Sequence, residues 1–194
     1  MQPGADDRVT IELLGEDGRL LARQLFFLNF NPNRKSGLVS DVPFEINAVA
    51  EVGRLQVYKE DEFGRPIALA SVDLILLSEG ASDINVPGDG LERIYIRQPV
   101  AGTLIQGGRV VLEGDARPVT NQPLVVELVN ERGGVVGSRV LPVAAGPANQ
   151  HRPFFIEVPY EVNEPTWVRL TIRERGERIP GTAYLSSVNI LLGP

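Results

Sequence analysis

The sequence repeats itself at a constant spacing, and this repeat constrains the fold more than any other feature. Residues 9–21 align without a gap to residues 124–136, and each segment has the pattern of a strand, a glycine turn and a returning strand. The turn glycines Gly18 and Gly133 coincide in this alignment. A tight hairpin turn needs a positive φ, which glycine adopts without strain. The two segments therefore predict equivalent β-hairpins.

Three further blocks repeat in the same order along the chain. They pair residues 43–46 with 153–156, 54–57 with 169–172, and 71–76 with 187–192. Independent convergence on four collinear blocks is improbable, so the repeat indicates duplication of a unit of roughly 100 residues, the size of a sandwich domain. We predict a first unit at 1–78, a linker at 79–92 and a second unit at 93–194.

The local pattern predicts an all-β chain of two tandem immunoglobulin-like β-sandwiches. Fifteen prolines and 20 glycines interrupt the sequence, alternation at period two recurs, and no stretch keeps an apolar stripe at helical spacing. The first unit has about five candidate strands and the second about seven, the number in an immunoglobulin-like sandwich. The predicted strands are 8–14, 19–27, 43–50, 53–60 and 67–77, then 93–97, 108–114, 123–129, 134–141, 153–160, 166–174 and 183–192.

The first unit thus lacks the equivalents of the first two strands of the second unit. Removing two strands from a sandwich uncovers an inner face and leaves unpaired backbone groups along an edge. One hypothesis, which we favour, is that strands upstream of Met1, residues 26–30 or the other repeat cover the gap. The other is that a protein partner, or a second copy of the chain, supplies a strand by β-augmentation.

Turn and core residues of the second unit are typical of one domain family. They are Ile96, Pro99, Gly102, residues 110–116, residues 125–129, Gly133, Pro153 and Phe154. Through them, residues 93–192 resemble the bacterial immunoglobulin-like domain associated with spore germination and cell-envelope lipoproteins, the Gmad type, and residues 8–77 resemble it more faintly. These residues specify a fold more than an activity. The resemblance implies an exported, non-catalytic accessory domain.

Composition excludes several classes of protein. The chain has no cysteine, which removes disulfides, thiolate nucleophiles and cysteine-based metal sites. The longest apolar run, residues 74–77, is far too short for a membrane helix, and residues 1–7 contain no signal core. We expect a soluble, extracytoplasmic protein whose signal segment or lipid anchor precedes Met1, which would then be an introduced start. Any membrane association would run through that anchor alone.

The charge balance argues against nucleic acid as a partner. The net charge is −6, and the acidic excess lies in residues 1–90, which contain 8 basic and 15 acidic side chains. Residues 91–194 contain 11 basic and 10 acidic side chains and have no strongly basic excess. Proteins that bind nucleic acid usually carry a basic patch or stripe.

The connector between the units concentrates oxygen ligands. A calcium ion prefers such ligands, and one bound here would stiffen two tandem sandwiches. The spacing fits no EF-hand loop, and residues of this kind are also common in turns, so we favour a plain linker with no cofactor. The candidate calcium ligands are Glu79, Asp83, Asn85, Asp89 and Glu92.

A short cationic ridge is predicted on one strand of the second unit. Alternation along 168–175 directs Val168, Leu170 and Ile172 inward, and sends Arg169, Thr171, Arg173 and Arg175 outward. The ridge could meet an acidic glycan or the acidic first unit. A solvated outer face is the commoner explanation, because exposed charge is usual there.

Aromatic residues suggest a second class of ligand. Tyr95, Tyr160, Trp167 and Tyr184 would stack on sugar rings if they formed an exposed platform. Trp167 aligns with the apolar Val52 of the first unit, so we predict that it lies in the core, as do Phe44 and Phe154. His151 is the sole histidine, and without a Gly-x-Ser-x-Gly motif we place it in a polar loop rather than in a serine triad.

These features favour a non-enzymatic binding protein. We predict an exported bacterial envelope protein that acts in adhesion, scaffolding or other protein interactions through its surfaces and strand edges, including self-association. The alternative is a carbohydrate-binding module of the cell wall or of an extracellular enzyme.

Overall fold

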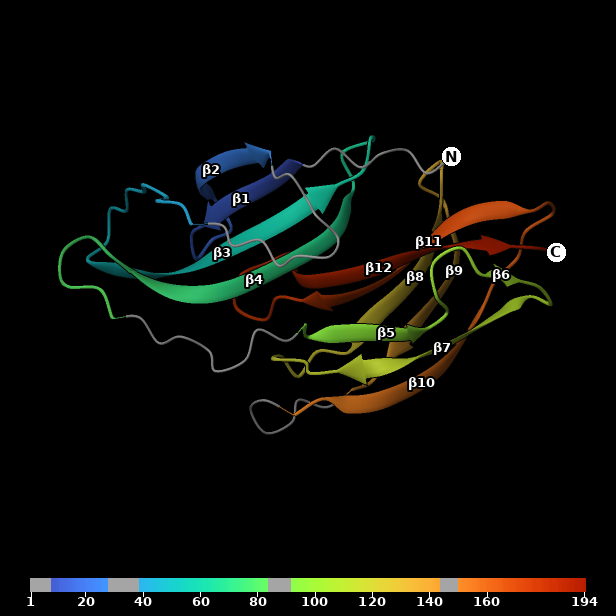
Figure 1. Cartoon of the computed structure of the whole chain (residues 1–194). Helices are drawn as coiled ribbons and strands as arrows, with labels where there is room; N and C mark the ends of the chain where they lie inside the picture. Colours follow the sequence, from blue (N-terminus) through green and yellow to red (C-terminus); the bar gives the residue numbers. More distant parts are fainter. Residues whose placement is uncertain (1–7, 28–38, 84–91, 144–149) are drawn as a thin grey trace. The chain divides into compact units, whose positions relative to one another are not determined.

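The computed structural model describes residues 8–27, 39–83, 92–143 and 150–194. Every regular element in these ranges is a β-strand, as Figure 1 shows, so the predicted all-β class is confirmed. Among the described residues there is no helix long and apolar enough to cross a membrane.

Internal contacts divide the chain into two units. The first comprises Met1–Asn85 with Arg178–Ala183, and the second comprises Val86–Glu177 with Tyr184–Pro194. The change from one unit to the other after Asn85 falls inside the predicted linker 79–92. The return of residues 178–183 to the first unit is a feature that the repeat did not indicate, because it depends on contacts far apart in the sequence.

The first unit contains an antiparallel sheet with the order β2-β1-β3-β4 (Figure 1). Its strands are β1 (Arg8–Leu14), β2 (Leu20–Phe27), β3 (Ala50–Glu60) and β4 (Pro66–Leu77). The β1–β2 hairpin turns at Gly18, whose φ of 80° is the positive value expected there. At the other side of the sheet, the Ser71 hydroxyl of β4 donates to the carbonyl of Ala183 within the same unit.

One predicted strand of this unit is wrong. Residues 43–49 form no strand, and only Ala50 of the predicted strand 43–50 is extended as part of β3. Pro43 has no backbone N–H to donate to a ladder. Just before Pro43, the Gln24 side chain of β2 donates to the backbone carbonyl of Asp41 at 2.6 Å, which holds this segment beside β2. Among its described residues the first unit therefore has four strands of its own, where five were predicted.

The second unit has two sheets. One has the order β12-β11-β8-β9, with β6 parallel to β12, and the other has the order β10-β7-β5. Two facing sheets built this way are an immunoglobulin-like sandwich. The short β6 was not predicted, because two residues cannot show alternation. The strands are β5 (Ile94–Gln98), β6 (Leu104–Ile105), β7 (Arg109–Ala116), β8 (Leu124–Asn130), β9 (Val135–Leu141), β10 (Arg152–Pro159), β11 (Thr166–Arg175) and β12 (Thr182–Leu192).

The main hydrophobic core lies between these two sheets. Leu112 of β7, Leu128 of β8 and Leu170 of β11 are fully buried in it. Gly114 allows β5 and β7 to approach, because a Cβ at this position would overlap the carbonyl oxygen of Tyr95. Its buried aliphatic and phenylalanine side chains are those of Ile94, Val110, Leu112, Ala116, Leu124, Val126, Leu128, Leu141, Val143, Phe154, Val158, Val168, Leu170, Ile172, Ile190 and Leu192.

The aromatic core predictions have a mixed outcome. Phe154 is buried in the core, as predicted. Trp167 is 46% exposed and Phe44 is 40% exposed, so both predictions of burial are wrong. In β11 the alternation that buries Val168 necessarily directs Trp167 to the other face. Phe44 is exposed because its segment does not join the sheet.

Candidate functional site

Strand β2 at the edge of the first unit is the strongest candidate for an interaction site. It pairs with β1 on one side and ends the strand order of the sheet. Leu20, Leu25 and Phe27 on this strand are 49%, 50% and 76% exposed. An exposed edge strand with large apolar side chains is a template on which another strand can pair.

The two faces of β2 differ in what covers them. On one face, Gln24 accepts a hydrogen bond from the Ser40 hydroxyl and donates one to the Asp41 carbonyl, so residues 40–41 lie against that side. Arg23, Leu25 and Phe27 alternate onto the other face, where Leu25 and Phe27 remain exposed. The apolar side chains available to a partner therefore gather on one face.

A buried carboxylate on β1 anchors the face of β2 that carries Arg23, Leu25 and Phe27. Glu12 of β1 has a side chain only 8% exposed. It accepts hydrogen bonds from Arg23 Nε at 2.6 Å, Gln56 Nε2 at 2.8 Å and the Tyr58 hydroxyl at 3.0 Å. These bonds join β2, β1 and β3 and hold the edge strand in place.

The Glu12 network predicts loss of stability in acid. Burial by itself raises the pKa of Glu12, but the hydrogen bonds from Arg23, Gln56 and Tyr58 outweigh it and hold the pKa below its ordinary value of 4.5. A lowered folded-state pKa contributes stability that is complete above pH 4.5 and is lost as the pH falls through the folded value. We expect the urea midpoint for unfolding of the first unit, measured by hydrogen exchange, to decrease as the pH falls through the folded-state pKa of Glu12.

Two variants check this assignment. Glu12→Gln should flatten the acid dependence, whereas Glu16→Gln, which changes an exposed carboxylate next to the same hairpin, should leave it as it is. An unchanged acid dependence in Glu12→Gln would contradict the role of the network.

The predicted calcium ligands are only partly described. Glu79, Asp83 and Glu92 are exposed, while Asn85 and Asp89 lie outside the described residues. In the described ranges, no three acidic or histidine side chains gather in a way that could hold a metal ion. Calcium binding at the connector stays a prediction.

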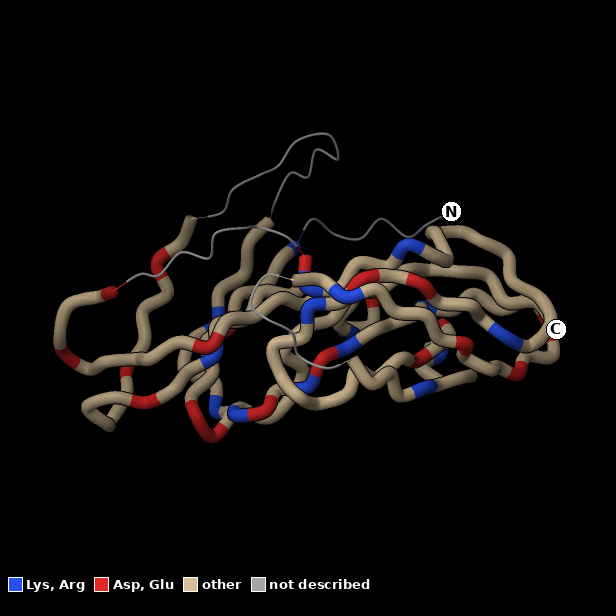
Figure 2. The backbone as a smooth tube through the Cα atoms, turned by 90° about the horizontal axis from the view of Figure 1, so that it is seen from below, with Lys and Arg blue, Asp and Glu red and all other residues tan. Residues whose placement is uncertain are grey.

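One residue of the predicted arginine ridge, Arg173, forms an ion pair within the protein. Arg173 donates to Glu127 Oε1 of β8 at 3.0 Å and is half-buried, as is Arg169, while Arg175 is exposed. Val168, Leu170 and Ile172 are buried, as predicted, but Thr171 is buried as well and its hydroxyl donates to the Glu127 carbonyl. Figure 2 shows acidic and basic positions interspersed along the described strands. A cationic surface at these residues stays a prediction.

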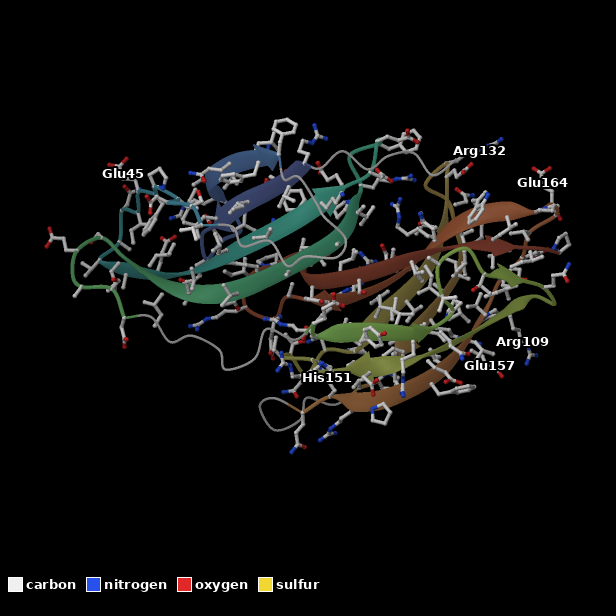
Figure 3. The ribbon with its side chains drawn as sticks, in the orientation of Figure 1. Glu45, Arg109, Arg132, His151, Glu157 and Glu164 are labelled. Atoms are coloured by element: carbon white, nitrogen blue, oxygen red, sulfur yellow. The ribbon has the colours of Figure 1, made fainter. Side chains whose placement is uncertain are left out.

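The aromatic residues do not form one platform. Tyr95 is 56% exposed on β5, whereas Tyr160 and Tyr184 are buried. Exposed Trp167 belongs to β11, which is in the other sheet of the sandwich. His151, labelled in Figure 3, lies just before β10 outside any strand, and its Nε2 is 2.7 Å from the carbonyl oxygen of Glu92.

One fully buried carboxylate was not among the predicted site residues. Glu174 of β11 accepts hydrogen bonds at Oε1 from the backbone N–H groups of Val119 and Thr120, at 2.7 and 2.8 Å. Arg93 Nη1 lies 3.8 Å from its other oxygen. The signal was available, because Glu174 has the same alternation as the inward-facing Ile172.

No family model matches the chain, and no curated protein matches it. The resemblance to the Gmad-type domain therefore stays a prediction from the residues that carry it.

Proposed function

We propose that this protein is a non-enzymatic binding module whose first unit accepts an extended segment of a protein partner alongside β2. The observation that supports it most is the exposure of Leu20, Leu25 and Phe27 on the edge strand of the first unit's sheet. An added strand would satisfy the backbone groups of the edge and cover these side chains.

The charge of the first unit favours one class of partner. The first unit, residues 1–85 with 178–183, contains 9 basic and 14 acidic side chains and has a net charge of −5. A second copy of the chain would bring this same charge to the edge, whereas a segment with flanking Lys or Arg would be attracted. We therefore propose an alternating apolar segment with basic flanks as the partner. In line with the sequence resemblance, we propose that the module works outside the cytoplasm at the cell envelope.

A displayed library of random linear peptides tests this proposal. The full chain should select peptides with alternating apolar residues and basic flanks. The double variant Leu25→Lys with Phe27→Lys should weaken their binding at least about tenfold, because lysines on an edge oppose strand addition. Both side chains are exposed, so the fold should survive the change.

The control variant alters a different edge. Val135→Lys with Val140→Lys introduces the same charges on β9, the last strand in its sheet, where the two valines are 54% and 59% exposed. Selected peptides should bind this variant as they bind the unaltered chain. Selection of no peptide, or equal binding to both double variants, would contradict the proposal.

A further inference from the structure

The outer face of the three-stranded sheet in the second unit carries exposed aromatic and apolar side chains. Because Val110, Leu112 and Ala116 of β7 point into the core, the alternate residues of this strand point outward. Tyr95 on β5 and Phe155 on β10 flank β7 and are 56% and 61% exposed. Val111, between them in the strand order, is 41% exposed.

The strand register places polar groups between these side chains. Tyr95 lies opposite Asp115, which lies opposite Pro153 on β10. In the next outward row, Phe155 lies opposite Glu113. With strands about 4.8 Å apart and residues about 3.4 Å apart along each strand, Tyr95 and Phe155 are separated by roughly 12 Å. This separation matches a short oligosaccharide better than a single small molecule.

Most charges on this face are already paired within it. Arg97 Nε is 3.2 Å from Asp115 Oδ2, and Arg109 Nη1 is 3.2 Å from Glu157 Oε2, a pair labelled in Figure 3. A face whose charges are neutralised in this way attracts no ion strongly. It still offers carboxylate and guanidinium groups that can exchange hydrogen bonds with hydroxyl groups.

A cleft continues this face at one end. Its volume is about 370 Å³, within the range of small-ligand sites, and Val111 and Arg109 line it from the outer face of β7. Gln98 at the end of β5 adds an amide, and Thr103 in the connection to β6 adds a hydroxyl, which donates to the Val100 carbonyl at 2.8 Å and can still accept a hydrogen bond. The remaining lining residues are Pro99, Val100 and Ile105.

From this geometry we propose that the outer face of β5, β7 and β10, with the adjoining cleft, binds a neutral oligosaccharide. Sugar rings present apolar C–H faces and a border of hydroxyl groups, which suits aromatic side chains separated by paired charges. A protein partner is less well matched, because the centre of a protein interface is depleted of charged residues. The site is separate from β2 and does not depend on the strand-accepting function.

Titration with soluble cello-oligosaccharides and chito-oligosaccharides, followed by ligand-observed NMR and calorimetry, tests the site. We expect saturable binding of at least one series. Tyr95→Ala and Phe155→Ala should each weaken it about 5- to 10-fold, the range expected for loss of one aromatic contact. Thr103→Val, which removes the cleft hydroxyl, should also weaken binding while preserving side-chain size.

Trp167→Ala is the matched control. Trp167 is an exposed aromatic residue of the same unit, but it belongs to the other sheet, so its loss should leave the affinity unchanged. As the single tryptophan, it should also show unchanged fluorescence during the titration. Absence of binding by both series, full affinity in Tyr95→Ala and Phe155→Ala, or loss of affinity in Trp167→Ala would each overturn the proposal. The double lysine variant of β2 should bind the sugar normally.

Discussion

Replacing Glu174 with alanine is expected to destabilise the second unit by about 3–5 kcal/mol, because two buried amides lose their acceptor at once. Glu174 is fully buried, and its Oε1 accepts from the N–H groups of Val119 and Thr120. Each buried donor left without a partner costs about 1–3 kcal/mol. Arg93, 20% exposed at its side chain, would also lose the carboxylate that faces it.

Tryptophan fluorescence measures this change directly, because Trp167 is the single tryptophan and lies on the same strand as Glu174. Urea unfolding of Glu174→Ala should show a lower midpoint with an unchanged slope. Glu174→Gln keeps an oxygen acceptor, so its unfolding midpoint should decrease less than that of Glu174→Ala. Glu164→Ala, an exposed position labelled in Figure 3, should change the midpoint little. A midpoint in Glu174→Ala equal to that of Glu164→Ala would show that the two amides do not depend on this side chain.

Replacing Arg54 with alanine is expected to destabilise the first unit by about 2–4 kcal/mol. The Arg54 side chain is 2% exposed, and its Nε donates to Asp73 at 2.9 Å. Its Nη1 donates to the carbonyl of Ile179 at 2.9 Å, and Ile179 is fully buried. The variant leaves that carbonyl without its donor and removes the packing of the arginine stem. Asp73 is half-exposed and can regain water, which limits the loss.

Hydrogen exchange of peptides from β3 and β4 gives the local free energy for this comparison. Asp73→Asn should cost less than Arg54→Ala, because the bond to Ile179 is kept. Arg19→Ala removes a 41% exposed arginine that is paired with Asp17 and Glu51, and should destabilise the first unit much less than Arg54→Ala, because exposed ion pairs contribute little. Equal losses in Arg54→Ala and Arg19→Ala would rule out a special role for the buried arginine.

Strands whose apolar residues alternate clearly were predicted to within one or two residues. The prediction 8–14 matches β1, and 19–27, 134–141 and 166–174 match β2, β9 and β11 closely. The failure at 43–50 arose from matching this segment to 153–156 in the repeat. The Pro-Phe pair is compatible with either an irregular segment or a strand. Residues 153–156 pair with β7 as part of β10, whereas residues 43–49 pair with no strand.

The candidate sites were predictable to different degrees. The first unit was expected to expose an edge because the repeat lacks two strands, but β2 is not that edge: its equivalent β9 also ends a sheet in the second unit, which has those strands. The sequence did not indicate that Leu25 and Phe27 would be the exposed residues, because local alternation does not show that residues 40–41 lie against the opposite, Gln24 face of β2. Of the proposed sugar-binding face, Tyr95 was among the aromatic residues that the sequence suggested, but Phe155 was not, because the two come from strands far apart in sequence that flank β7.

The sequence by itself determined the all-β class, most strand positions and the glycine turns, because alternation and positive φ are properties of neighbouring residues. Tertiary structure alone decided the joining of residues 178–183 to the first unit and the burial of Arg54 and Glu174. Their partners lie 125 and about 55 residues away in the chain. A buried polar group requires a partner, but local sequence carries no information on which distant backbone group will provide it.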